Sequence, residues 1–174
     1  DYNSNYFTAS YEYLKPQFYD ILFPIKSNFY LETNFGNRTS SNTKTKQSLI
    51  AVKAFNNFKL NRKNSVYLNI DAANLISDNY FENELLRFGG INSIRGFEEN
   101  SLFASLFGVL NTEYRYRLSN SIYIHSITDV AYFENKTSNL KEKLFGFGFG
   151  FGILTNSGLL KFNYANGKNE NQKF

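Results

Sequence analysis

The sequence predicts an all-β chain that forms an antiparallel transmembrane β-barrel, and three observations lead to this prediction. Aromatic residues make up 18% of the 174 residues, which is too many for a disordered chain. The mean hydropathy of −0.42 is too polar for a bundle of membrane helices, and no apolar run approaches the roughly 20 residues that a spanning helix needs. Apolar and polar residues instead alternate with a period of two, as in strands between lipid and a polar lumen.

This alternation predicts about eight strands, whereas helical periodicity is convincing nowhere. The expected strands lie near residues 6–14, 27–37, 47–60, 65–76, 103–118, 121–133, 143–155 and 158–166. In the fifth of them Asn111, Glu113, Arg115 and Arg117 lie opposite an apolar and aromatic face, so we interpret both arginines as lining a lumen. Charges are costly in a dry core but natural in a wet lumen, which favours a membrane barrel over a soluble sandwich or lipocalin-like barrel.

The connections between the strands alternate between short and long. Residues 61–64 (Asn-Arg-Lys-Asn) and 155–158 (Thr-Asn-Ser-Gly) are turn sequences. The longest connection spans residues 77–101, and a loop of that length is usually functional or disordered. Outer-membrane barrels place tight turns on one side and long loops on the other.

One strand has an aromatic face and a face without side chains. Its four phenylalanines, at 145, 147, 149 and 151, alternate with Gly146, Gly148, Gly150 and Gly152. Because glycine weakens a strand, four in register indicate that another segment approaches the backbone closely there. We interpret the phenylalanine face as a lipid-facing or girdle band, with a buried strand of a soluble barrel as the alternative.

Charge and composition argue against several other functions. The formal net charge of +4 comes from scattered Lys and Arg in polar stretches, which we interpret as solvated loops and not as a nucleic-acid site. No cysteine is present, so disulfides and thiolate metal sites are excluded. His125, the only histidine, is expected in the lumen or girdle, and no metal or cofactor is expected. The first residues lack a signal-peptide layout, so we expect a mature chain or a piece of a larger one.

The long connection contains the sequence Arg87-Phe-Gly-Gly-Ile-Asn-Ser-Ile-Arg-Gly-Phe97. It resembles the signature of the BamA/TamA superfamily of outer-membrane β-barrel insertases, of the bacterial surface antigen type. The signature there is a glycine pair, a short spacer, and an aliphatic residue followed by Arg-Gly and an aromatic, on a loop that folds back into the lumen. Gly89 and Gly90 match the pair, and Arg95, Gly96 and Phe97 match the end of the pattern.

The resemblance continues through nearly all of the chain after the loop. Glu113 and Asp129 stand where the family carries inward acids on the next two strands, although Val130 and Ala131 depart from the usual Asp-x-Gly pattern. Residues 146–152 and 158–165 resemble the two strands before the last one. Residues 1–86 fit by strand pattern alone.

The resemblance implies a buried ion-pair cluster, because an arginine carried into a lumen needs acceptors for its five donors. The strand phases place Glu113 and Asp129 on the non-lipid face, where one guanidinium could bridge them. Gly96 would permit close approach, Phe97 would pack against the lumen wall, and the glycine track at 146–152 would make room for the loop. The alternative is that Arg95 is exposed in a mobile surface loop.

The family's barrels have sixteen strands, so the resemblance implies that residues 1–174 form a partial barrel domain, its C-terminal half. A closed barrel of eight strands is the alternative. A half-barrel leaves two edges that cannot face lipid unpaired, so the remainder of its own barrel or a partner must cover them.

The implied function is the folding and insertion of outer-membrane proteins in the bacterial outer membrane, without enzymatic chemistry. The expected partners are the lipid bilayer, lipopolysaccharide, nascent outer-membrane proteins and accessory assembly proteins. Three alternatives stay open: a two-partner secretion pore, the barrel of a patatin-type phospholipase fusion, and an unrelated small adhesin-like or structural barrel.

Overall fold

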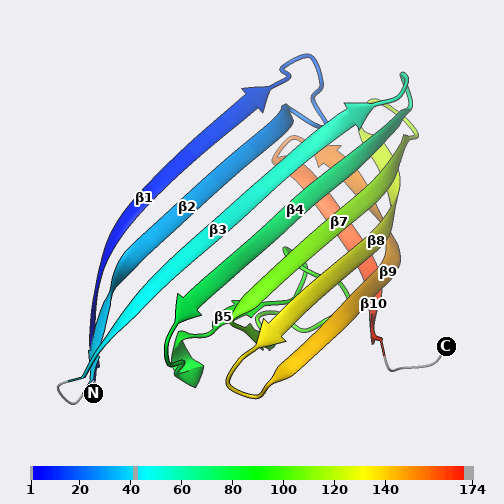
Figure 1. Ribbon diagram of the computed structural model, residues 1–174. Coiled ribbons are helices and arrows are strands. Elements are labelled where there is room, and N and C mark those ends of the chain that lie inside the picture. The colour runs from blue at the N-terminus through cyan, green and yellow to red at the C-terminus, as the bar shows by residue number, and fades with distance from the viewer. Residues whose placement is uncertain (1, 41–42, 171–174) are drawn as a thin grey trace.

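One large antiparallel sheet dominates the computed structural model, which describes residues 2–40 and 43–170. The eight strands follow the order of the chain across the sheet (Figure 1). They are β1 (Tyr2–Pro16), β2 (Ile25–Ser40), β3 (Thr43–Lys59), β4 (Asn64–Ser77), β7 (Leu106–Arg117), β8 (Ile122–Asn135), β9 (Leu140–Thr155) and β10 (Gly158–Asn169). The all-β prediction and the eight predicted strands are confirmed, and several strands are longer than expected. No described helix is long and apolar enough to cross a membrane.

The long connection between β4 and β7 has structure of its own. It contains a 3-10 turn, η1 (Glu82–Glu84), and a hairpin of β5 (Leu86–Phe88) with β6 (Leu102–Ala104). The expectation of a single strand over residues 103–118 is wrong, because Ser105 separates β6 from β7. Its backbone N–H and its hydroxyl both donate to the carbonyl of Glu134, at 2.7 and 2.9 Å. We call residues 78–105 the inner loop.

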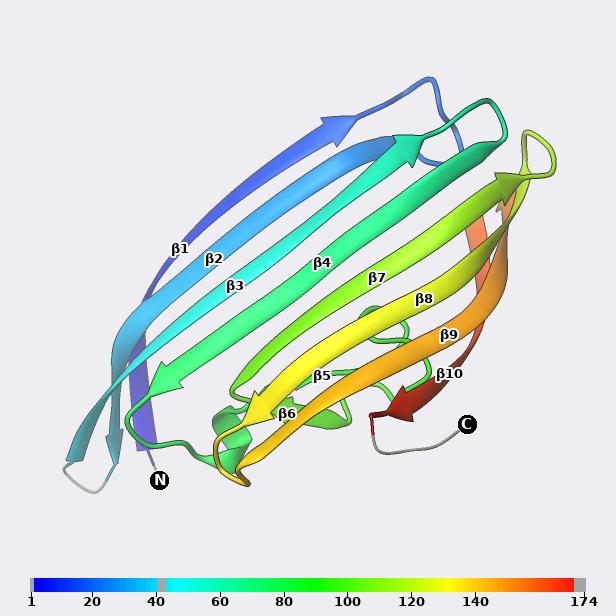
Figure 2. The same ribbon diagram turned by 45° about the vertical axis from the view of Figure 1, so that its right-hand side comes forward.

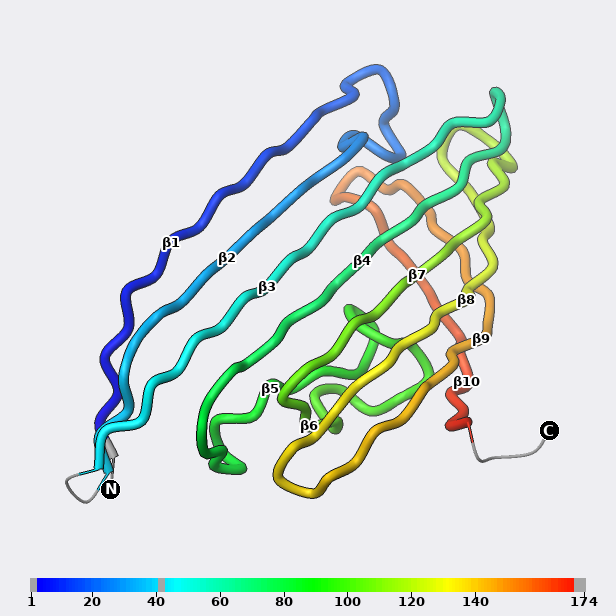
Figure 3. The backbone as a smooth tube through the Cα atoms, in the orientation of Figure 1, coloured from blue at the N-terminus to red at the C-terminus, as the bar shows by residue number. Residues whose placement is uncertain are grey.

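The sheet curls into a trough, and the inner loop lies inside it. Figures 1 and 2 show β10 turned round behind the plane of β2–β4, and in Figure 3 the loop folds back beneath β7 and β8. The connections at residues 78–105 and 136–139 share one end of the sheet, the loop end. Those at residues 17–24, 60–63, 118–121 and 156–157 share the other, the turn end. The predicted turns at residues 61–64 and 155–158 are thus confirmed.

The two faces of the sheet do not divide as they do in a water-soluble protein, because the convex face exposes apolar residues and the concave face buries charged and polar residues beside an apolar core. Along β8 the concave face buries His125 and Asp129, whereas Ile124 and Val130 are exposed on the convex face. The face alternation predicted for β7 is confirmed in the same way. Large exposed apolar residues continue across the convex face from strand to strand, including Phe58, Ile70, Leu110, Tyr114, Ile124, Phe147, Phe149, Phe162 and Tyr164.

The sheet is open within the described residues. β1 pairs with β2 and β10 pairs with β9, and these two strands are the ends of the order rather than neighbours of each other. The described residues therefore do not form the closed eight-stranded barrel that was the alternative to a half-barrel.

An apolar core at the loop end packs the inner loop against the sheet. The ring of Phe88 stacks on Phe107 with centroids 4.7 Å apart and meets Phe133 edge-on at 5.4 Å. Ile94, which is fully buried, belongs to the same cluster together with Leu144 of β9. Because Ile94 is fixed in this core, the next residue enters the polar part of the concave face.

Candidate functional site

Arg95 is buried on the concave face and makes hydrogen bonds through three of its side-chain nitrogens. Its Nε and one terminal nitrogen donate to the two oxygens of Asp129, at 2.8 and 2.6 Å. Its backbone N–H donates to the same carboxylate at 3.0 Å. The other terminal nitrogen donates to Glu113 at 2.5 Å. The structure thus brings together the three residues expected to meet, and we call them the Arg95 lock.

Strand register explains why the two carboxylates converge. Asn111 of β7 lies directly opposite Asp129 of β8, so Glu113 is one inward position further along β7. Both carboxylates are buried, at 1% and 0% exposure, and each would be costly there without charged partners. The forked guanidinium serves both at once, which an ammonium group on a flexible stem does less well.

Glu113 is shared by three cations. One of its oxygens accepts from Arg95 and, at 2.8 Å, from Lys161 of β10. The other accepts from Nε of Arg115 at 2.7 Å and forms an ion pair with a terminal nitrogen of the same guanidinium, also at 2.7 Å. Arg115 was expected only as a lumen-lining residue, and Lys161 was not singled out. The alternation of β10 does place Lys161 on the inner face. Its ion pair with Glu113 of β7, three strands away in the sheet, could not be predicted from the sequence.

The loop glycines stand where side chains would not fit. Gly96 has a φ of +93°, and an added Cβ would lie 2.3 Å from the backbone nitrogen of Gly167 in β10. The ring of Phe97 lies against Gly167 as well, and Phe97 is partly buried beside the loop-end core. Gly89 and Gly90 also have positive φ, and they lie against the backbone and side chains of residues 98–99. The signature glycines therefore shape the loop and seat it on β10.

The glycine track of β9 is only partly used by the loop. A Cβ on Gly146 would lie 2.3 Å from the carbonyl oxygen of Arg95, so this glycine does make room for the loop. The expectation is wrong for the other three. The nearest atoms at Gly148 and Gly150 belong to β10 and His125, and at Gly152 to the ring of Tyr123. These glycines accommodate the large inward side chains of β8 and the close approach of β10.

Asparagines hold the backbone of the loop on either side of the lock. Asn111 donates to the carbonyl of Ser93 at 2.6 Å, and Asn69 of β4 donates to Asn111 at 2.8 Å. The first half of the inner loop has an anchor of its own on β2. Arg38, 1% exposed, forms an ion pair with Glu84 of η1 and lies 3.8 Å from the ring centroid of Phe81. This anchor could not be predicted from the sequence, because Arg38 and Glu84 are far apart in the chain.

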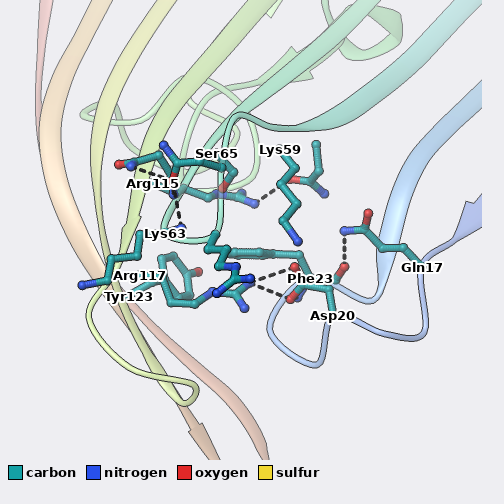
Figure 4. Close-up of a pocket in the computed structure, with 13 residues that line it drawn as sticks. Gln17, Asp20, Phe23, Lys59, Lys63, Ser65, Arg115, Arg117 and Tyr123 are labelled. Carbon is teal, nitrogen blue, oxygen red and sulfur yellow. Dashed lines mark hydrogen bonds and ion pairs between the residues drawn. The ribbon is translucent and has the colours of Figure 1, made fainter.

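A second polar cluster lies at the turn end, where the β1–β2 loop (residues 17–24) bends onto the concave face (Figure 4). One nitrogen of Arg117 donates to both oxygens of Asp20, at 2.8 Å each. The ring of Phe23 meets Tyr123 edge-on at 4.9 Å and lies 4.5 Å from the guanidinium of Arg115. We call Asp20, Phe23, Arg117 and Tyr123 the turn-end cluster. Arg117, expected in the lumen, does lie on the concave face.

His125 lies between the two clusters, on the inner face where a lumen residue was expected. Its Nε2 is 2.8 Å from Oδ1 of Asn163 in β10. Within residues 2–40 and 43–170, no group of three or more His, Cys, Asp or Glu side chains could hold a metal ion. The arrangement is suited to fixing two loops on the concave face by charge-assisted hydrogen bonds.

Comparisons with known proteins add no relative: no protein-family model matches the chain, and no curated protein matches it.

Proposed function

We propose that this chain is part of an outer-membrane β-barrel of the BamA type, which assists the folding and insertion of other outer-membrane proteins. The observation that carries the proposal is the buried Arg95 lock. The loop that resembles the family's signature lies inside the trough, and its arginine is bonded to the two acids that the resemblance names.

The polarity of the two faces supports a membrane setting. Large apolar side chains are exposed along the convex face. On the concave face, nine strand residues with a charged, amide or imidazole side chain are buried in the described part of the chain: Arg38, Gln47, Asn57, Asp71, Asn111, Glu113, Arg115, His125 and Asp129. An apolar surface of this extent on a monomer marks a partner or a membrane. A lipid-facing exterior with a polar interior is the arrangement of transmembrane barrels.

The open edges support a larger barrel. A backbone N–H or C=O group without a hydrogen bond costs several kcal/mol in the hydrocarbon core of a bilayer. The groups on the outer sides of β1 and β10 would carry this cost if these two edges faced lipid. The proposed barrel therefore includes further strands that pair with both edges, supplied by the rest of the protein. In this setting the inner loop acts as a brace inside the barrel and takes part in no covalent chemistry.

The test is depletion of the full-length protein in the bacterium that encodes it, followed by quantification of the outer-membrane proteome. Complementation would use the wild-type protein, Arg95→Ala, and Arg87→Ala as the matched control, since Arg87 is an exposed arginine of the same loop. We expect depletion to lower many barrel proteins together, and the wild type and Arg87→Ala to restore them better than Arg95→Ala.

Two outcomes would contradict the proposal. Loss of a single secreted protein, with other barrels unchanged, would indicate a secretion pore instead. Recovery of the protein outside the outer-membrane fraction would contradict the membrane setting itself.

A further inference from the structure

Two loops reach the concave face from opposite ends of the sheet, and their contacts meet at Arg115. From the loop end, the inner loop contributes Arg95, which binds Glu113. From the turn end, the β1–β2 loop contributes Phe23, whose ring lies against the Arg115 guanidinium. Arg115 binds Glu113 as well. A continuous chain of contacts therefore runs from Phe23 through Arg115 and Glu113 to Arg95.

Arg115 has little freedom to move independently of these partners. Its side chain is 7% exposed, and its guanidinium lies 4.3 Å from the ring of Tyr67 and 4.5 Å from that of Phe23. A third nitrogen donates to Asn57 at 2.7 Å. Among these contacts, Phe23 is the one that comes from a loop, and the others come from strands. The β1–β2 loop therefore completes the enclosure of the Arg115 guanidinium. Cations enclosed by aromatic rings gain more when they are shielded from water.

Glu113 transmits the position of Arg115 because its two oxygens have different partners. Arg115 holds one oxygen, while Arg95 and Lys161 hold the other. Rotation of the carboxylate toward or away from Arg115 therefore changes its bond to Arg95. In a buried site of low dielectric, such linked bonds strengthen one another, and an imperfect arrangement is costly.

We propose that Arg115 is a positioning residue that couples the two loops, so that release of the β1–β2 loop at the turn end loosens the Arg95 lock, and the reverse. The coupling uses contacts within this chain and does not depend on which outer-membrane function the protein has. Because linkage is reciprocal, a change at either loop has the same effect on the other.

The test is hydrogen exchange on the purified full-length protein. The amides of Gln17, Asp20 and Phe23 are hydrogen-bonded within the β1–β2 loop, and that of Arg95 is bonded to Asp129, so each loop has its own markers. We expect Arg95→Ala to accelerate exchange in residues 17–24, and Phe23→Ala to accelerate it at residue 95, by about fivefold or more, the lower range of measured site-to-site coupling.

Arg38→Ala is the matched control, because it frees the same inner loop from β2 at a place remote from Arg115. It should accelerate exchange in η1 and leave residues 17–24 unchanged. In an Arg115→Met background, where Glu113 keeps Arg95 and Lys161, the effect of each mutation on the opposite loop should vanish. Exchange changes confined to the mutated loop, or a cross-effect that persists without Arg115, would overturn the proposal. If Arg95→Ala does not fold, Arg95→Lys gives the same comparison.

Discussion

Asp129 receives three hydrogen bonds from one residue, and this makes Arg95 hard to replace. Two of the three require the planar fork of the guanidinium, and Glu113 is bound by the same group. Removing the arginine leaves one buried carboxylate without its charged partner and another with one cation fewer. At the scale of single residues, the stability of the loop therefore depends on complete pairing of buried charges.

We expect Arg95→Ala to lower the free energy of unfolding by about 3–5 kcal/mol, the range for breaking a buried ion pair from one side. Asp129→Ala should cost a similar amount, and the double mutant less than the sum. Arg95→Lys should retain only part of the stability that Arg95→Ala loses, because a lysine cannot bind both carboxylates with the geometry of the guanidinium. Unfolding in detergent, followed by the shift in electrophoretic mobility on heating, measures these changes. Additive losses in the cycle would show that the two residues do not interact.

Two glycines on the sheet give a matched pair for testing how closely the loop packs. Gly146→Ala would place a methyl group 2.3 Å from the carbonyl oxygen of Arg95, whereas a Cβ on Gly108 meets nothing within 4 Å. We expect Gly146→Ala to destabilise by about 1–3 kcal/mol through overpacking. Gly108→Ala should be neutral or stabilising by up to about 1 kcal/mol, since glycine in a strand is unfavourable. Equal effects in the same unfolding assay would contradict the close approach.

At the scale of elements, the inner loop is anchored to both halves of the sheet. Arg38 on β2 holds η1 through Glu84, and Gln47 on β3 donates to the same carboxylate at 3.0 Å. Further along, the loop is held on β7 and β8 by the Arg95 lock and contacts β10 at Gly167. The loop therefore spans the trough from β2 to β10.

Because the anchors are separate, they should be released separately. We expect Arg38→Ala to accelerate cleavage by a glutamate-specific protease after Glu82 and Glu84, and Arg95→Ala to accelerate cleavage after Glu98 and Glu99. Mass spectrometry of the fragments measures both. Lys53→Ala is the control, since it removes an ion pair with Asp71 on the same concave face, where Lys53 is 61% exposed. Cleavage at all four sites in either variant would mean that the loop is held as one unit.

The strands and their two faces could be predicted because the alternation of apolar and polar residues is contained within each strand and needs no knowledge of distant contacts. Glu113 and Asp129 were found by combining that alternation with the family signature. The hairpin of β5 and β6 could not be predicted, because segments of three residues carry no periodicity and exist through docking on Phe107 and Phe133. The Arg38–Glu84 anchor and Lys161 were missed because they depend on how distant strands align. Three glycines of β9 were assigned to the loop because the sequence does not show which segments of β8 and β10 pack against them.

At the scale of the whole molecule, the convex apolar face is the feature that the proposed membrane setting explains. We expect Phe149→Lys, on the exposed side of β9, to disfavour folding into lipid vesicles by about 2–4 kcal/mol, the cost of a cation near the middle of a bilayer. Phe18→Lys is the control, because Phe18 is even more exposed but belongs to the β1–β2 loop at the turn end. The yield of folded protein in vesicles should be lower for Phe149→Lys than for Phe18→Lys. Equal yields would argue against a lipid-facing convex side.

The inner loop also bears on the order in which such a barrel is assembled. The loop lies on the concave face and is held there from β2 to β10, so strands added at the two open edges would enclose a space that the loop already occupies in part. A folded loop with its own hairpin and buried charges would not pass through a finished wall of paired strands. The lock would therefore form first and the seam between the edges last, and a mutation that delays the lock would delay closure without altering either edge.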